Sequence, residues 1–203
     1  MAQRDLPQSI DDKIMRSIKA RRRASAFSAK DFLHFGKRPA ISQALTRLVK
    51  QDKLRRVRQG LYDLPRPHPI LGVTSPDPAG VVHALMKDTG AQWQFSGAYA
   101  ANRLGLSEQV PAKIVVLTDA TPRRVHLGKL TLIVRHAAPR NLLGAGRPAG
   151  LIIQALRHMK RGLSPQVIER LRARLDADTK RDLSALSGEL PAWMQPIVEH
   201  LVT

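Results

Sequence analysis

Residues 27–64 read FSAKDFLHFGKRPAISQALTRLVKQDKLRRVRQGLYDL, and this stretch decides the fold. It opens with a short helix, because Ser28 is a suitable N-cap and Asp31 can reach back to it in a capping box. Phe27 and Phe32 fall at the two positions of a hydrophobic staple around this helix start. Local signals therefore predict a capped helix at the beginning of the stretch.

A second helix is predicted from Pro39 to Gln51. Gly36 is expected in the left-handed conformation that closes the first helix, and Pro39 suits the first turn of the next one. Helical spacing then separates two faces. The predicted buried face contains Ile41, Ala44, Leu45 and Leu48. The opposite face is polar and partly cationic, and it contains Gln43, Thr46, Arg47 and Lys50.

Beyond this helix the sequence period changes to the near-alternation typical of strands. Residues 54–57 and 61–64 are predicted to pair as a hairpin around the turn Arg58-Gln59-Gly60. Either Arg55 or Arg56 should face solvent, because adjacent strand residues point to opposite sides. A helix, a turn, a helix and a basic hairpin indicate a winged helix-turn-helix, whose second helix enters the DNA major groove. The alternative is an ordinary α+β fragment whose charges form a solvated face.

In the DNA-binding interpretation, Gln43 and Arg47 read base edges, since Gln can pair with adenine and Arg with guanine. Thr46 offers a methyl group to thymine. The predicted phosphate contacts are Lys37, Arg38 and Lys50. Arg58, at the hairpin tip, is predicted to enter a minor groove. The complete set predicted to contact DNA is Lys37, Arg38, Ser42, Gln43, Thr46, Arg47, Lys50, Arg55, Arg56, Arg58 and Gln59.

The composition favours a nucleic-acid partner. The 203 residues include 34 Lys and Arg against 16 Asp and Glu, a formal net charge of +18, and such a field attracts polyanions. No apolar run approaches the roughly 20 residues that span a bilayer, and the start MAQRDLPQSIDDK lacks the apolar core of a signal peptide. The absence of cysteine rules out disulfides and thiolate metal sites. We therefore expect a cytoplasmic protein.

The first predicted helix runs from Ser9 to Arg22, with an apolar stripe of Ile10, Ile14 and Ile18. The basic run from Lys19 to Arg23 lies at its end. These cations can complement the helix dipole in solvent, or they can contact phosphate.

A proline-rich segment, LPRPHP at residues 64–69, is the predicted domain boundary. It is stiff and is not expected to join a strand ladder. The chain carries 16 basic against 6 acidic residues up to Leu64, and 18 against 10 beyond it. The predicted organisation is a winged helix-turn-helix domain at 1–64, a linker at 65–76, and an α+β domain at 77–203.

The second domain is predicted to be a small mixed sheet with helices packed against it. Expected strands lie at residues 93–95, 114–117, 123–127 and 130–134. Expected helices lie at residues 77–88, 97–104, 150–159, 164–175, 179–186 and 191–201.

No pattern indicates an enzyme, a cofactor or a metal. The seven histidines form no H-E-x-x-H or H-x-x-x-H pair; they are His34, His68, His83, His126, His136, His158 and His200. The segment Gly144-Ala145-Gly146-Arg147 precedes a helix and could cradle a phosphate, but a plain loop explains it as well. Trp93 and Tyr99 are expected in the core.

Several motifs resemble AbiEi-type antitoxins of prokaryotic type IV toxin–antitoxin, or abortive-infection, systems. FSAKDF, AISQALTRL and LRRVRQGLY are similar to the N-terminal winged helix of that family. The likeness continues beyond the predicted linker and spans most of the chain. The segments that carry it there are residues 96–106, 110–111, 113–118, 150–156 and 190–194.

This resemblance implies an antitoxin that represses its own operon by binding repeats in the promoter. It also implies a C-terminal domain that counters a toxin resembling a nucleotidyltransferase, generally without a stable complex between the two. Two other readings stay open. The second domain could sense a small molecule for a winged-helix regulator, or it could hold an acidic partner protein directly.

Overall fold

The computed structural model describes residues 9–21, 26–69, 72–128 and 130–203. Its contacts divide the chain into two compact units. The first comprises the chain up to Thr89 together with His126–Lys129, and the second comprises Gly90–Val125 with Leu130–Thr203. The segment predicted as a linker thus lies inside the first unit. Each unit is α+β, in agreement with the predicted fold class.

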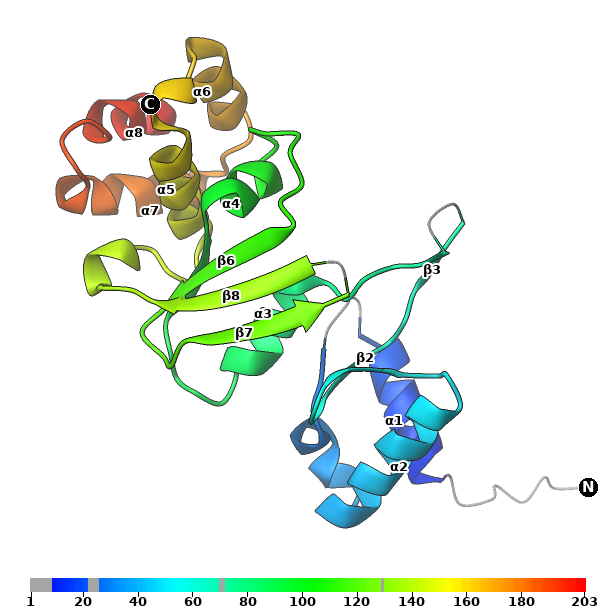
Figure 1. Cartoon of the computed structure of the whole chain (residues 1–203). Helices are drawn as coiled ribbons and strands as arrows, with labels where there is room; N and C mark the ends of the chain where they lie inside the picture. Colours follow the sequence, from blue (N-terminus) through cyan, green and yellow to red (C-terminus); the bar gives the residue numbers. More distant parts are fainter. Residues whose placement is uncertain (1–8, 22–25, 70–71, 129) are drawn as a thin grey trace, which may run out of the picture. The chain divides into compact units, whose positions relative to one another are not determined.

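The first unit begins with helices and continues into a hairpin (blue to cyan in Figure 1). Phe27 forms an antiparallel bridge with Tyr62, with backbone N–H···O distances of 2.8 and 2.9 Å. The chain before η1 therefore pairs with the second hairpin strand. In chain order the elements are α1 (Ile10–Lys19), η1 (Ala29–Phe35), α2 (Arg38–Lys50), β1 (Arg55–Arg58) and β2 (Leu61–Asp63).

The local predictions for η1 are confirmed at its start, although the helix is of the 3-10 type. The Asp31 carboxylate accepts hydrogen bonds from the Ser28 backbone N–H at 2.8 Å and from its hydroxyl at 3.2 Å. The Phe27 and Phe32 rings meet edge to face, with centroids 5.4 Å apart. The predicted capping box and staple thus fix where η1 begins.

The two faces predicted for α2 are also confirmed. The four residues predicted for its buried face are at most 1% exposed, and they join the α1 stripe and the two phenylalanines in one core. This core orients α2, so that its polar face is turned to solvent. The core contains Ile14, Ile18, Phe27, Phe32, Ile41, Ala44, Leu45, Leu48, Leu54 and Tyr62.

The prediction for Gly36 is wrong. Its φ of 162° is extended, so no left-handed residue closes η1. The reason for glycine is space, because an added Cβ would lie 3.3 Å from the Ile10 side chain. Glycine is therefore favoured at position 36 because the turn packs closely against α1, and not because the backbone is left-handed there.

The proline-rich segment does form a ladder, contrary to prediction. β3 (Pro67–His68) pairs with β4 (Gly72–Val73) in an antiparallel two-stranded sheet. Proline is compatible with such a pair because an edge strand needs a partner on one side only. The chain then enters α3 (Pro78–Met86), where Asp77 caps the backbone N–H groups of Ala79 and Gly80.

The second unit contains a four-stranded mixed sheet in the order β5-β6-β8-β7, with β5 antiparallel and β8 parallel to β6 (green in Figure 1). The strands are β5 (Trp93–Ser96), β6 (Lys113–Thr118), β7 (Arg123–Leu127, whose last two residues are counted with the first unit) and β8 (Leu130–His136). Its helices are α4 (Gly97–Arg103), η2 (Pro139–Asn141), α5 (Pro148–Met159), η3 (Lys160–Gly162), α6 (Pro165–Arg172), α7 (Ala177–Leu186), η4 (Ser187–Glu189) and α8 (Gln195–Val202).

Two glycines, Gly144 in the loop before α5 and Gly150 in the first turn of α5, serve close packing, whereas Gly146 has open space and a left-handed φ of 78°. An ideal Cβ on Gly150 would lie 2.2 Å from the Gly144 carbonyl oxygen and 2.3 Å from Oε1 of the buried Gln94. The Gln94 amide nitrogen donates to the Asn141 carbonyl at 2.7 Å, and the Arg147 guanidinium pairs with Asp182 at 2.8 Å. These contacts explain why glycine stands at positions 144 and 150.

Candidate nucleic-acid interface

The exposed face of α2 gathers the residues predicted to contact DNA. Lys37 is the N-cap residue and Arg38 the first helical residue, so both cations lie at the start of α2. The helix contains no acidic residue, and most of the predicted set on it is exposed. Ser42, the exception, is half-buried at the edge of this face. The exposed members are Lys37, Arg38, Gln43, Thr46, Arg47 and Lys50.

Arg47 is held by an aspartate from another helix. Its Nε donates to one carboxylate oxygen of Asp11 at 3.1 Å, and its Nη2 donates to the other at 2.6 Å. These hydrogen bonds, with the attraction of the two charges, raise the pKa of the Arg47 guanidinium above its ordinary value. The Arg47 side chain nevertheless keeps 51% of its surface exposed, whereas that of Asp11 keeps 20%. The pair therefore leaves the guanidinium open to a ligand and shields the carboxylate.

The Thr46 hydroxyl is turned back onto its own helix. It donates to the Ser42 carbonyl oxygen at 2.9 Å, one turn earlier. With the hydroxyl engaged in this way, the methyl group is the part of Thr46 left for an outside contact. This geometry is compatible with the predicted contact to a thymine methyl.

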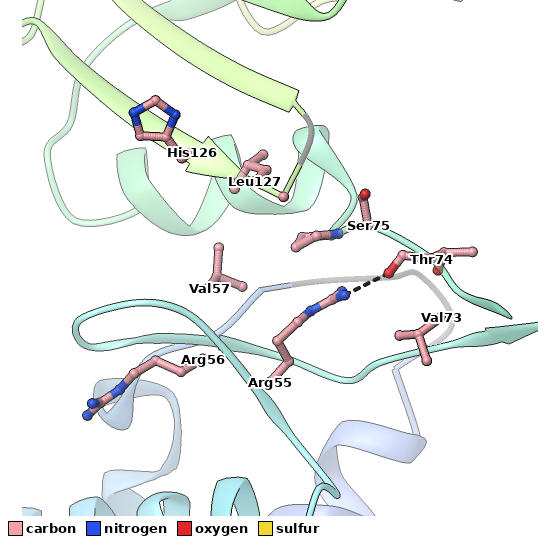
Figure 2. Close-up of a pocket in the computed structure, with 10 residues that line it drawn as sticks. Arg55, Arg56, Val57, Val73, Thr74, Ser75, His126 and Leu127 are labelled. Carbon is pink, nitrogen blue, oxygen red and sulfur yellow. Dashed lines mark hydrogen bonds between the residues drawn. The ribbon is translucent and has the colours of Figure 1, made fainter. Parts of the chain in front are cut away.

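Arg55 is engaged within the first unit. Its Nε and Nη2 donate to the two carboxylate oxygens of the buried Asp63 at 2.9 and 2.6 Å. Its Nη1 donates to the Thr74 carbonyl oxygen at 2.7 Å, as Figure 2 shows. All three nitrogens of the guanidinium therefore have partners, so the structure gives Arg55 a scaffolding role.

Arg56 points the opposite way from Arg55 (Figure 2), so Arg56 is the solvent-facing member of the two. Its guanidinium lies 5.7 Å from the centroid of the Tyr62 ring, and its Nη2 is 3.4 Å from the Tyr62 hydroxyl. Tyr62 itself is buried. The hairpin thus presents Arg56 on an aromatic support.

The tip of the hairpin exposes Arg58 and Gln59. The strand register shifts between Arg56 and Arg58, which is a bulge that re-aims the strand end. Gly60 follows with φ of 74°, a left-handed value that glycine adopts without strain. The Arg58 side chain has no hydrogen bond or ion pair with any other residue that the structure describes.

The basic run after α1 does not act as one group. Lys19 is exposed in the last turn of the helix, as the solvated-end alternative predicts. The Arg21 guanidinium lies 5.7 Å from the Phe27 ring centroid and 5.4 Å from that of Phe32. Arg21 is therefore packed over the aromatic core of the first unit, where cation–π attraction holds it. Arg22 and Arg23 lie outside the described residues.

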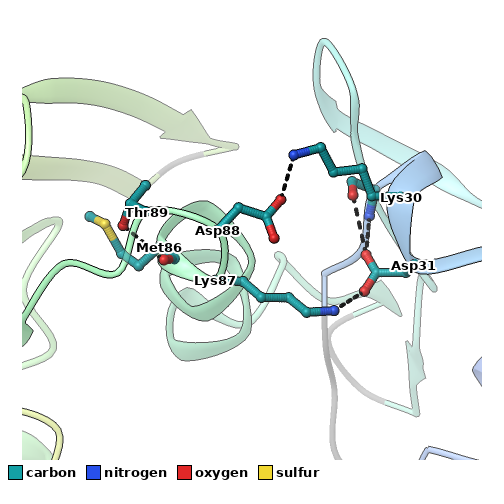
Figure 3. A network of polar contacts seen from close by, with 7 residues as sticks. Lys30, Asp31, Met86, Lys87, Asp88 and Thr89 are labelled. Atoms are coloured by element: carbon teal, nitrogen blue, oxygen red, sulfur yellow. Dashed lines mark hydrogen bonds and ion pairs between the residues drawn. The ribbon is translucent and has the colours of Figure 1, made fainter.

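Two ion pairs connect η1 with the end of α3 (Figure 3). Lys30 pairs with Asp88 at 2.8 Å, and Lys87 pairs with Asp31 at 2.5 Å. Burial acts to raise the pKa of Asp31, but hydrogen bonds from Lys87 and the Ser28 N–H outweigh it and hold that pKa below its ordinary value. Asp31 thus serves both the capping box of η1 and the connection to α3.

Sequence reasoning missed Asp11 as a member of this surface. It was recognisable only as an acidic residue in the first turn of α1, where acids complement the helix dipole. Its partner is 36 residues away, and no local pattern indicates which cation it meets. The Phe27–Tyr62 bridge was missed for the same reason.

The described residues contain neither a metal-binding cluster nor a membrane-spanning helix. No group of three or more His, Asp or Glu side chains there is placed to hold a metal ion. No helix in the described part of the chain is both long and apolar enough to cross a membrane.

Comparison with known proteins identifies a family match. The model of a family of unknown function, DUF6088, matches residues 13–183. No curated protein matches the chain. A crystal structure of the RV2827C protein from Mycobacterium tuberculosis is similar at 16% identity and a TM-score of 0.42, covering 99% of this chain and 78% of that one. This likeness is too weak to carry an argument about fold or function.

Proposed function

From the premise that the chain belongs to DUF6088, a family of unknown function, we propose that its first unit is a winged helix-turn-helix that binds duplex DNA. We further propose that the protein regulates transcription, and that it represses its own operon. The observation that carries DNA binding is the exposed face of α2, a polar and cationic surface without an acidic residue on the helix.

The order of elements supports this proposal. In a winged helix-turn-helix a helix with a polar outer face enters the major groove, and a basic hairpin beside it touches the backbone or the minor groove. Here α2 follows η1 after a two-residue turn, and the hairpin follows α2. The bridge from Phe27 to Tyr62 ties the start of η1 to that hairpin. One shared core thus holds helix and hairpin together.

The proposed roles follow the exposure of each side chain. Gln43, Thr46 and Arg47 read bases in the major groove, with Ser42 at the margin of that contact. Arg56, Arg58 and Gln59 form the wing contact, with Arg58 at the tip. Arg55 acts by shaping the hairpin. The phosphate contacts are Lys37, Arg38 and Lys50.

Binding of the full-length protein to fluorescent duplex DNA tests this proposal. With about five phosphates neutralised at one site, log K should fall against log salt concentration with a slope of about −4 to −5. Binding should also be tighter to a duplex selected from a random library than to its scrambled version. No binding to either duplex at low ionic strength would refute the proposal.

The antitoxin role rests on the sequence resemblance to AbiEi-type antitoxins, and we propose it for the second unit. The partner would be a nucleotidyltransferase-like toxin encoded beside this gene. Co-expression of the two genes should relieve growth arrest caused by the neighbouring product alone. A variant with Arg47→Ala tests the separation of roles, because relief should persist while promoter repression is lost. An inert neighbouring product would remove the antitoxin role and leave DNA binding in place.

A further inference from the structure

Asp11 binds only one edge of the Arg47 guanidinium, and which edge it binds matters for contact with DNA bases. Asp11 takes the edge of the guanidinium formed by Nε and Nη2. We propose that Asp11 is a specificity-determining residue, which positions Arg47 so that its other edge, formed by Nη1 and Nη2, meets a guanine. This inference rests on the proposed function and names the residue that gives α2 its base preference.

The donor count of arginine allows both contacts at once. A guanidinium carries five N–H donors, and the pair with Asp11 uses one on Nε and one on Nη2. Three donors remain, two on Nη1 and one on Nη2. Guanine presents two acceptors, N7 and O6, in the major groove, and arginine binds them bidentately. The free edge of Arg47 therefore matches guanine while Asp11 stays bound.

The exposure of the pair fits an orienting role better than a stabilising one. Ion pairs between exposed side chains contribute little to folding stability. A long side chain that is already fixed before binding, however, loses less conformational entropy when it meets its ligand. Asp11 lies in the first turn of α1, beside Asp12, while Arg47 lies in the last turn of α2. The contact thus fixes Arg47 from a second helix that the core holds in place.

The charge of Asp11 has a second consequence. A carboxylate beside Arg47 partly cancels its attraction for phosphate, which is the source of sequence-independent binding. Removal of that charge should strengthen binding to any duplex while it releases Arg47 from its fixed orientation. Affinity for random DNA and preference for the selected sequence are therefore expected to change in opposite directions.

Asp11→Asn in the full-length protein, compared with Asp12→Asn, tests the inference. Asp12 is the adjacent acid, and among the described residues its side chain hydrogen-bonds only to the capping Ser9, at 2.6 Å between the side chains, while the Asp12 backbone N–H donates to the Ser9 hydroxyl at 3.2 Å. Both variants lose one negative charge, so the difference between them isolates the contact with Arg47. The probes are one duplex selected by the wild-type protein from a random library and its scrambled version.

We expect Asp11→Asn to lower the ratio of selected to scrambled affinity by roughly 10-fold, the scale of one bidentate base contact. Binding to the scrambled duplex should be equal or tighter. Asp12→Asn should keep the wild-type ratio. Asp11→Glu, which restores the charge one methylene farther out, should recover part of the ratio.

Three results would overturn the inference. The ratio in Asp11→Asn could equal that of the wild type, or both affinities could fall together, which would mark Asp11 as a general support of the fold. Asp12→Asn could also lower the ratio of selected to scrambled affinity to the same degree, which would show that the lost negative charge, and not the contact with Arg47, causes the change. If the wild-type protein binds neither duplex, the proposed function fails first, and that result is distinct from a retained ratio.

Discussion

The α2 face and the hairpin each contain an arginine that is paired with an aspartate. The two ion pairs differ in whether the second edge of the guanidinium stays free. Arg47 and Arg55 both donate through Nε and Nη2 to a carboxylate, with nearly equal distances. The remaining edge of Arg55 meets the Thr74 carbonyl, whereas that of Arg47 meets no other described residue. The Arg–Asp pair therefore stabilises the hairpin at Arg55, whereas at Arg47 it leaves N–H donors available to a ligand.

Burial explains the difference. Asp63 lies in the hairpin strand at 7% exposure, so a half-buried arginine is needed to compensate its charge. Asp11 lies on the flank of α1 and is only partly shielded. Arg55 therefore has a structural role, because the Thr74 carbonyl occupies its second edge. Arg47 is a candidate for DNA recognition, because its second edge faces solvent.

The largest expected effect is on stability, at the hairpin. Asp63→Ala leaves Arg55 half-buried without its counter-ion, and loss of one partner of a buried pair costs about 3–5 kcal/mol. Because the Arg55 side chain keeps 28% of its surface exposed, we expect a smaller loss of about 2–3 kcal/mol in the free energy of unfolding. Urea denaturation measures it.

The matched control is Asp11→Ala, which should leave the denaturation midpoint nearly unchanged. If Asp11→Ala and Asp63→Ala destabilise the protein equally, the two ion pairs do not differ in their contribution to stability, and the contrast drawn between them is wrong.

The next effect is on DNA binding, at α2. Arg47→Ala should weaken binding to the selected duplex by about 10- to 100-fold and binding to the scrambled duplex by much less, because one bidentate base contact is removed. Lys50→Ala should weaken both duplexes alike and make the salt slope shallower by about 1. Fluorescence anisotropy at several salt concentrations measures both variants. Equal losses for Arg47→Ala on the two duplexes would exclude it from base reading.

A smaller effect is expected at the hairpin tip. Gly60→Ala places a side chain at φ of 74°, where L-residues are strained by about 1–2 kcal/mol, while no atom lies within 4 Å to clash with it. Thermal denaturation should therefore show a modest loss of stability from backbone strain alone. Gly162→Ala, at another position with open space, serves as the control. A Gly60→Ala protein as stable as wild type would place the turn in another conformation in solution.

The smallest effect concerns acid, at η1. The pKa of Asp31 is lower in the folded protein than its ordinary value, since hydrogen bonds from Lys87 and Ser28 outweigh the effect of burial. A lowered pKa means that Asp31 stabilises the fold above its unfolded pKa and that this contribution disappears as pH falls through the folded value. The loss should therefore occur as the pH falls through and below the ordinary carboxyl value of 3.8.

Asp31→Asn should flatten that part of the curve of melting temperature against pH. An unchanged slope in Asp31→Asn would show that other carboxyl groups account for the acid sensitivity.

Features that depend on residues close together in the sequence could be predicted, whereas features that depend on contacts between distant elements could not. The capping box of Ser28 and Asp31 and the two faces of α2 depend on neighbours a few residues away, so periodicity and caps were sufficient. Gly36 was misjudged because its constraint comes from Ile10, on a different helix. Sequence reasoning misses the pairing of β3 with β4 because proline cannot donate a ladder hydrogen bond, although an edge strand in a two-stranded sheet tolerates it.

The candidate site shows the same limit. The exposed residues of α2 were identified from spacing, but the partners of Arg47 and Arg55 depend on contacts between elements. Asp11 is 36 residues from Arg47, and the Thr74 carbonyl is 19 residues from Arg55. Sequence patterns indicate which side chains reach solvent, and the packing of helices decides which of those are already engaged.

Placement of α2 against bases is the central claim, and site-directed cross-linking tests it most directly. The chain has no cysteine, so Gln43→Cys introduces a single thiol on the exposed face of α2, and Ser184→Cys introduces one on the exposed part of α7. We predict that Gln43→Cys forms a disulfide with a thiol tethered to a base in the major groove of the selected duplex, whereas Ser184→Cys does not. Equal cross-linking by both variants, or none by Gln43→Cys while the duplex is bound, would contradict the account.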